Sequence, residues 1–151
     1  MCSIFSFVLV FSLFAGCITD NPTTDNQNTE KSKKIGNVVV TLNDVEITQY
    51  AKNNHRIIAY FSAENKGNKA ITVSGNTKLI DYAGVEHLGG AVSFQRMYPG
   101  ETAVSDDEYI TTNIKEYDAL FQKPATISGF FMDTQRNMNT VNWIVNLNEY
   151  K

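Results

Sequence analysis

From Ile35 onward the chain alternates apolar and polar side chains with a period of two, which is typical of half-buried β-strands. In the first run Val38, Val40 and Leu42 share one face, and the apolar phase then shifts by one position across residues 43–44, which predicts a β-bulge. Strands are predicted over residues 38–47, 55–65, 70–74, 78–82, 91–97, 101–111, 125–133 and 140–148.

The clearest alternation lies in residues 55–65, where Ile57, Ala59 and Phe61 face one way and Tyr60 and Ser62 the other. This pattern predicts a central strand.

One helical signal interrupts the strands. Asn113 and Glu116 have the spacing of a capping box, and Pro124 marks a stop. We therefore expect one short helix near residues 113–122.

Seven or eight short strands, separated by turns about every 8–12 residues, predict an all-β fold, an antiparallel β-sandwich. The stretches RIIAYFSAENKGNKAITV and MYPGE, within residues 36–111, resemble immunoglobulin-like domains of unknown function on bacterial and archaeal lipoproteins. They are also similar to cell-adhesion-related domains of surface proteins. The resemblance implies an immunoglobulin-like sandwich and brings no shared catalytic residues.

Residues 4–15 form an uncharged apolar run, too short to cross a hydrocarbon core that needs about 20 residues. The run and the following Ala15-Gly16-Cys17 resemble the lipobox of prokaryotic lipoproteins, which implies that Cys17 is lipidated and becomes the mature N-terminus. The alternative is that residues 1–18 pack as a short buried element.

Residues 19–34 favour the lipoprotein interpretation, because their polar composition is that of a solvated tether. We expect a signal peptide over 1–16, a lipidated cysteine and flexible tether over 17–34, and a β-sandwich domain over 35–151.

Charge and cysteine content narrow the function classes. The net charge of −3 argues against a nucleic acid partner, since the basic footprint for phosphate binding is missing. The two cysteines are Cys2 and Cys17, so the domain can form no internal disulfide and no cysteine-based zinc site. No cofactor is expected.

Asp106, Asp107 and Glu108 are candidate Ca²⁺ ligands, because this ion prefers several hard oxygen donors. On an extended strand, however, Asp107 points away from the other two, so at most two side chains converge. The alternative is an acidic, solvated strand edge that discourages strand pairing.

Tyr60, Tyr82 and Tyr98 are candidates for an exposed binding surface, since tyrosine offers amphipathic area at low entropic cost. The alternative, which is the more common situation, is that they are half-buried strand residues. A hydrolase would combine His55 or His87 with a serine such as Ser93 or Ser105, but no Gly-x-Ser-x-Gly elbow is present, and we interpret both histidines as exposed loop residues.

These features predict a non-catalytic binding or interaction module, lipid-anchored to the cell membrane and exposed on its extracytoplasmic side. Its expected partners are the membrane and an envelope or extracellular protein or polymer. The alternatives are an exported small-ligand or Ca²⁺-binding protein and, less favoured, a surface hydrolase.

Overall fold

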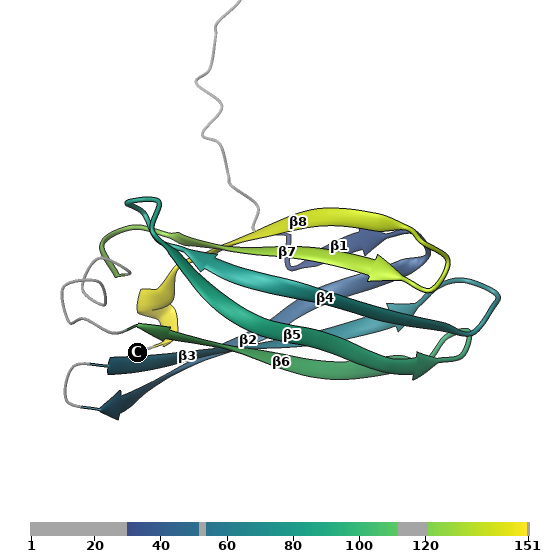
Figure 1. Ribbon diagram of the computed structural model, residues 1–151, viewed down its shortest axis with the longest axis horizontal. Coiled ribbons are helices and arrows are strands. Elements are labelled where there is room, and N and C mark those ends of the chain that lie inside the picture. Colours follow the sequence, from purple (N-terminus) through teal and green to yellow (C-terminus); the bar gives the residue numbers. More distant parts are fainter. Residues whose placement is uncertain (1–29, 52–53, 112–120, 151) are drawn as a thin grey trace, which may run out of the picture.

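The computed structural model describes residues 30–51, 54–111 and 121–150, which form two packed β-sheets (Figure 1). Phe121 and Gln122 are helical, and the rest of the predicted helix lies outside the described residues. The elements are β1 (Ser32–Ile35), β2 (Val38–Ala51), β3 (Asn54–Asn65), β4 (Ile71–Ile80), β5 (Glu86–Met97), β6 (Thr102–Thr111), β7 (Ala125–Asp133), β8 (Met138–Val145) and the 3-10 turn η1 (Leu147–Tyr150).

The strands pair in the orders β1-β2-β3-β6, here called sheet A, and β5-β4-β7-β8, here called sheet B. All paired strands are antiparallel. If β2 to β8 are lettered A, B, C, C′, E, F and G, the sheets read A-B-E and C′-C-F-G, an immunoglobulin-like arrangement with C′ on the sheet of G, F and C. The predicted all-β, immunoglobulin-like sandwich is confirmed, and so is the central position of β3.

The core lies between the sheets and is filled by the inward half of each alternating strand. At its centre the ring of Trp143 lies 5.4 Å from that of Phe61 and 6.2 Å from that of Phe131. Packing of such rings stabilises the sandwich, which contains no disulfide within the described residues.

Three strands are longer than predicted: β2 continues to Ala51, and in β4 and β5 glycine is the reason. Residues 70–74 and 78–82 belong largely to one strand, β4, which continues through Gly75. Phe131 of the neighbouring strand packs against Gly75 so closely that a Cβ there would lie 2.6 Å from Cδ1 of Phe131, so glycine is needed within the strand. β5 begins at Glu86, ahead of the predicted residue 91, and includes Gly89 and Gly90. Glycine here permits close approach of strands and does not mark a turn.

The predicted domain boundary at residue 35 lies within β1. Ser32 to Ile35 pair with β2, and Ile35 is fully buried. The predicted bulge in β2 is confirmed by the register shift between Leu42 and Asp44.

The open edges of the two sheets meet along two seams. At the seam between β1 and β8, Nε1 of Trp143 donates to the backbone oxygen of Lys31 at 2.7 Å, and Nδ2 of Asn139 donates to that of Lys34 at 3.2 Å. At the seam between β5 and β6 the backbone N–H of Gly90 donates to Oδ1 of Asp107. Since side chains close both seams, the two outer faces are the broad surfaces left for partners.

Candidate binding surfaces

The outer face of sheet B, here called the neutral face, carries almost no charge. Of the sixteen residues that make up the face, only Lys78 and Glu86 are charged, and they pair with each other at 2.5 Å. Beyond these residues, the exposed Arg96 lies at the end of β5, beside Tyr98. In register order the face comprises Ser74, Asn76, Lys78 and Ile80 of β4, Glu86, Leu88, Ala91 and Ser93 of β5, Thr126, Ser128, Phe130 and Met132 of β7, and Met138, Thr140, Asn142 and Ile144 of β8.

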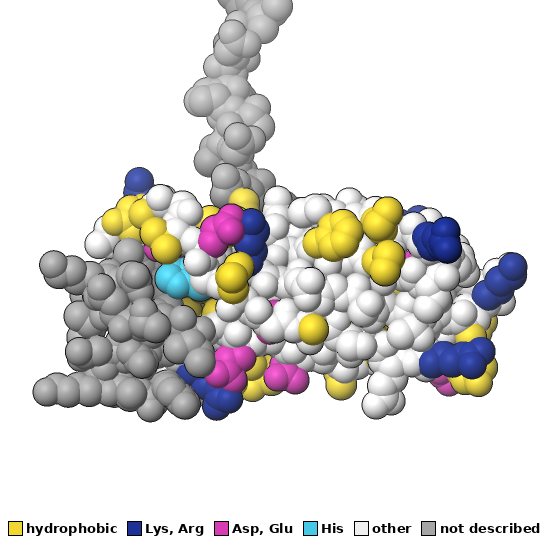
Figure 2. All heavy atoms as spheres, in the orientation of Figure 1, with side chains coloured by type: hydrophobic (Ala, Val, Ile, Leu, Met, Phe, Trp, Pro, Cys, Tyr) yellow, Lys and Arg dark blue, Asp and Glu magenta, His cyan; other side chains and the backbone are white. Residues whose placement is uncertain are grey.

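The neutral face also holds most of the exposed large apolar side chains. Among the described residues nine such side chains are exposed, and five of them lie here: Leu88, Phe130, Met132, Met138 and Ile144. Met132 stands directly opposite Met138 in the register of β7 and β8, with Phe130 two positions along β7. Figure 2 shows an apolar group over β7 and β8 with uncharged side chains and backbone around it and a Lys or Arg side chain beyond its right-hand end. Clustered apolar exposure of this kind marks an interaction site more often than scattered apolar residues do.

The outer face of sheet A, here called the acidic face, has the opposite character. It carries five carboxylates and two cations, and among its described side chains the one exposed large apolar group is Val104. The face comprises Lys34 of β1, Val39, Thr41, Asp44 and Glu46 of β2, Arg56, Ile58, Tyr60, Ser62 and Glu64 of β3, and Thr102, Val104, Asp106 and Glu108 of β6.

Tyr60 lies at the centre of the acidic face. Asp44 and Asp106 are its direct neighbours on the two flanking strands, and its hydroxyl donates to Oε2 of Glu46 at 2.7 Å. That hydrogen bond, together with the surrounding carboxylates, raises the pKa of the Tyr60 phenol above 10.0.

The three candidate tyrosines do not form one surface. Tyr82 lies in the turn before β5 and Tyr98 in the turn after it, each within cation–π distance of a basic residue, Lys123 and Arg96 respectively. A strand of 12 residues is about 40 Å long, so these two lie at opposite ends of the sandwich. Tyr60 belongs to the outer face of the other sheet.

The candidate Ca²⁺ ligands are likewise divided. Asp106 and Glu108 lie on the acidic face, where Glu108 pairs with Arg56, whereas Asp107 is turned into the sandwich and is 5% exposed. No group of three His, Cys, Asp or Glu side chains that could hold a metal ion occurs within the described ranges.

Asp107 takes part in a buried hydrogen-bond network at the seam of β5 and β6. Thr77 donates to Oδ2 of Asp107, and because its hydroxyl has a single proton, Tyr109 is the donor to Thr77. Oδ1 accepts the backbone N–H groups of Gly90 and Glu108. Burial raises the pKa of Tyr109 far above its usual value. Three hydrogen bonds to one buried carboxylate, with a fourth from Tyr109 to Thr77, indicate a structural link between the sheets.

A second buried pair lies at the start of β5. Nε2 of His87 lies 3.7 Å from Oδ2 of Asp81 and has no hydrogen-bond partner in the described part of the chain. Oδ1 of Asp81 accepts the N–H groups of Ala83 and Val85, which holds the β4–β5 turn.

The prediction that His87 is an exposed loop residue is wrong, because it lies in β5 on the inner face and is 7% exposed. Ser93 points outward from the same strand, and no serine bonds to His87 among the described residues. The side chain of His55 lies outside the described residues.

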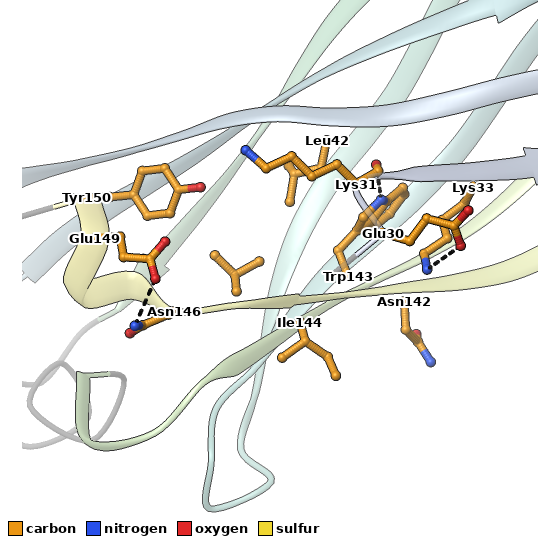
Figure 3. A pocket seen from close by; sticks show the side chains of 11 residues that line it. Glu30, Lys31, Lys33, Leu42, Asn142, Trp143, Ile144, Asn146, Glu149 and Tyr150 are labelled. Atoms are coloured by element: carbon orange, nitrogen blue, oxygen red, sulfur yellow. Dashed lines mark hydrogen bonds and ion pairs between the residues drawn. The ribbon is translucent and has the colours of Figure 1, made fainter. Parts of the chain in front are cut away.

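An open groove of about 200 Å³ lies at the seam of β1 and β8, next to η1 (Figure 3). Leu42, Trp143 and Val145 form its apolar floor. Figure 3 shows Lys31, Glu149 and Tyr150 around one end and the Glu30–Lys33 pair at the other. An apolar floor with charges of both signs at the rim suits a small amphipathic molecule.

Comparison with known proteins gives likeness of fold. No protein-family profile and no curated protein matches the chain. One similar solved structure is the Northeast Structural Genomics Consortium target SoR45, which is 10% identical with a TM-score of 0.48. The match covers 75% of this chain and 84% of that one. A conserved hypothetical protein from Bacillus anthracis is also 10% identical, with a TM-score of 0.45, and the match covers 74% of this chain and 92% of that one. An uncharacterized β-sandwich protein from Clostridium difficile is 10% identical with a TM-score of 0.44, and the match covers 75% of this chain and 89% of that one.

A β-glucosidase from Kluyveromyces marxianus is also similar, at 10% identity and a TM-score of 0.42, but the match covers 15% of that chain. At these values none of the likenesses assigns an activity.

Cys17 and the predicted signal and tether up to residue 29 lie outside the described residues. Across residues 30–51, 54–111 and 121–150, no helix is both long and apolar enough to cross a membrane.

Proposed function

We propose that this protein is a non-catalytic binding module, anchored to the cell membrane through a lipid on Cys17 and exposed on the extracytoplasmic side. The neutral face is its binding surface. The observation that carries this proposal is the concentration of exposed apolar side chains, led by Phe130, Met132 and Met138, on a face whose two central charges, Lys78 and Glu86, pair with each other.

The anchor is supported by the lipobox-like Ala15-Gly16-Cys17 and by the polar tether that follows. Because β1 begins at Ser32, the tether comprises residues 18–31, roughly 14 residues with a coil dimension of about 20 Å, so the domain would stay near the bilayer but turn freely. Two acyl chains at one cysteine are sufficient for stable attachment.

The mass of the N-terminal peptide from native membranes tests the anchor. A peptide that begins at lipid-modified Cys17 is the expected result, and an unmodified chain beginning elsewhere would refute it.

A photo-crosslinking amino acid tests the binding face. Placed at Phe130 in the full-length protein in its native membrane, it should give a discrete adduct. Placed at Val104, which is 75% exposed on the acidic face, it should give none. Equal labelling from both positions, or from neither, would argue against the neutral face as the binding surface.

The groove beside η1 favours a second candidate function, an exported small-ligand-binding protein. Calorimetry of the purified protein with CaCl₂ and with panels of saccharides and peptides tests this alternative and the Ca²⁺ alternative together. Heat that disappears on Trp143→Ala, in a variant that remains folded, would place a ligand in the groove.

A further inference from the structure

We infer that the partner of the neutral face is a second copy of this chain: two anchored molecules pack neutral face against neutral face about a twofold axis. The inference rests on the proposed function and names the partner of that same surface.

The charge on each face decides which faces can meet. A twofold contact sets a patch against its own copy, so a patch with net charge repels itself. Within the sixteen residues of the neutral face the charges are Lys78 and Glu86, which are already paired within one molecule, and the exposed Arg96 lies beyond them at the end of β5. A contact between two acidic faces would bring five carboxylates of one copy against five of the other. Charge therefore permits self-association through sheet B and opposes it through sheet A.

The shape of the neutral face suits stacking on itself. Sheets pack face to face at about 10 Å when side chains of the two surfaces interdigitate. Phe130, Met132 and Met138 project from neighbouring strands, and the small side chains of Ser74 and Ser93 continue the row of Met132 across β4 and β5. Rotation about the axis lays the large side chains of one copy over the small ones of the other, and methionine adapts well to such a surface.

The size of the face indicates a weak dimer that depends on the membrane. Four strands about 4.8 Å apart and about eight residues long give a footprint of about 500 Å² per copy, or about 1,000 Å² in all, the lower end of specific interfaces. Tethering raises the effective concentration of the two copies. With the axis along the membrane normal, both tethers reach the same bilayer.

The acidic face also explains why such assembly would end at two copies. In the dimer both acidic faces point outward. A third copy would have to cover Asp44, Glu46 and Asp106 with the apolar centre of its neutral face, where the one cation, Lys78, is already paired with Glu86, and this would remove the carboxylates from water. The contact therefore closes as a pair.

A cysteine introduced into the full-length protein tests the contact, because the described domain contains no cysteine of its own. In a Cys2→Ser background, Ser74→Cys places a thiol on central strand β4 of the neutral face. The matched control, Ser62→Cys, places it on central strand β3 of the acidic face. A bifunctional maleimide of about 10 Å reach, applied to native membranes, should join Ser74→Cys molecules into a species of twice the chain mass and leave Ser62→Cys monomeric.

A second substitution tests the chemistry of the contact. Phe130→Asp adds a like charge to both copies at the interface and should reduce the cross-linked fraction at least about tenfold, since 1.4 kcal/mol corresponds to a factor of ten. Val104→Asp on the acidic face should leave it unchanged. Both positions are exposed, so both variants should keep the parent thermal midpoint. If Phe130→Asp lowers the midpoint, Met138→Asp replaces it.

Each outcome separates the inference from the proposed function. Absence of the double-mass species, or equal cross-linking from Ser62→Cys, overturns the dimer. An adduct of different mass from the photo-crosslinker at Phe130 also overturns the dimer but leaves the neutral face as the binding surface. No adduct of any kind from Phe130 overturns both.

Discussion

Replacing Gly89 with alanine tests whether the two sheets are joined through the buried Asp107 network. A Cβ at position 89 would lie 2.8 Å from Cγ of Asp107 and 2.8 Å from Cε1 of Tyr109, with Oδ2 of Asp107 closer still. Ordinary carbon contacts begin near 3.4 Å. Either β5 must move away from β6, or the carboxylate must turn away from its donors.

The magnitude follows from these two routes. Moving β5 outward lengthens the bond from the Gly90 N–H, and turning the carboxylate breaks the one from Thr77. A hydrogen bond to a charged group contributes about 1.5–3 kcal/mol. Replacing glycine by alanine also lowers the entropy of the unfolded chain, which raises the free energy of unfolding by about 0.4–1 kcal/mol and offsets part of this loss. We expect Gly89→Ala to lower the free energy of unfolding by about 2 kcal/mol.

Gly90→Ala is the matched control on the same strand. Its Cβ would meet one atom, Oδ1 of Asp107, at 3.2 Å, which a small shift relieves. We expect a change within about 0.5 kcal/mol, because the entropic gain offsets the shift.

Urea unfolding followed by the fluorescence of Trp143, the single tryptophan, measures both variants. With an m-value of about 2 kcal/mol/M, 2 kcal/mol moves the midpoint by about 1 M. If Gly89→Ala unfolds at the parent midpoint, or Gly90→Ala is the more damaging change, the network does not constrain the distance between β5 and β6.

Two further predictions concern the core. Phe131→Ala should lower the free energy of unfolding by about 3–5 kcal/mol because Phe131 is fully buried, whereas Phe130→Ala should stay within about 0.5 kcal/mol, both measured in urea. Because burial raises the pKa of Tyr109, the folded state keeps a proton that the unfolded state loses above about pH 10, so stability present below pH 10 should fall as the pH rises further. The urea midpoint should decline less steeply from pH 10 to pH 11.5 in Tyr109→Phe than in the parent, and equal slopes would contradict this assignment.

Alternation along the chain predicts the sandwich well, since burial of one face is what specifies a strand. It fails at glycines. Gly75, Gly89 and Gly90 interrupt the apolar pattern and were expected to lie outside the strands, but each lies where a neighbouring strand or side chain comes unusually close. The space that a glycine leaves is visible only when its partner across the sheet is known.

The candidate surfaces were harder to predict than the fold. The alternation of Ile127 and Phe131 already places Phe130 and Met132 on the opposite side of their strand. What it does not contain is the pairing of β7 with β8, which brings Met138 to the same row. Tyr60, Tyr82 and Tyr98 share a residue type but no surface, because the strands and turns that carry them point in different directions. The burial of His87 depends on where β5 begins.

The separation of charge between the two faces points to a role for each. The acidic face carries five carboxylates and two cations, a balance of −3, which equals the net charge of the whole chain, so the remaining residues are balanced among themselves. Folding imposes no such separation, because any polar side chain can occupy an outward strand position exposed to water. A sheet that only had to remain soluble would mix charges over both faces and expose few large apolar groups. The neutral face has few charges and several exposed large apolar groups, as expected of a surface that a partner covers. The acidic face lies on the other side of the domain, and its carboxylates keep that side in contact with water.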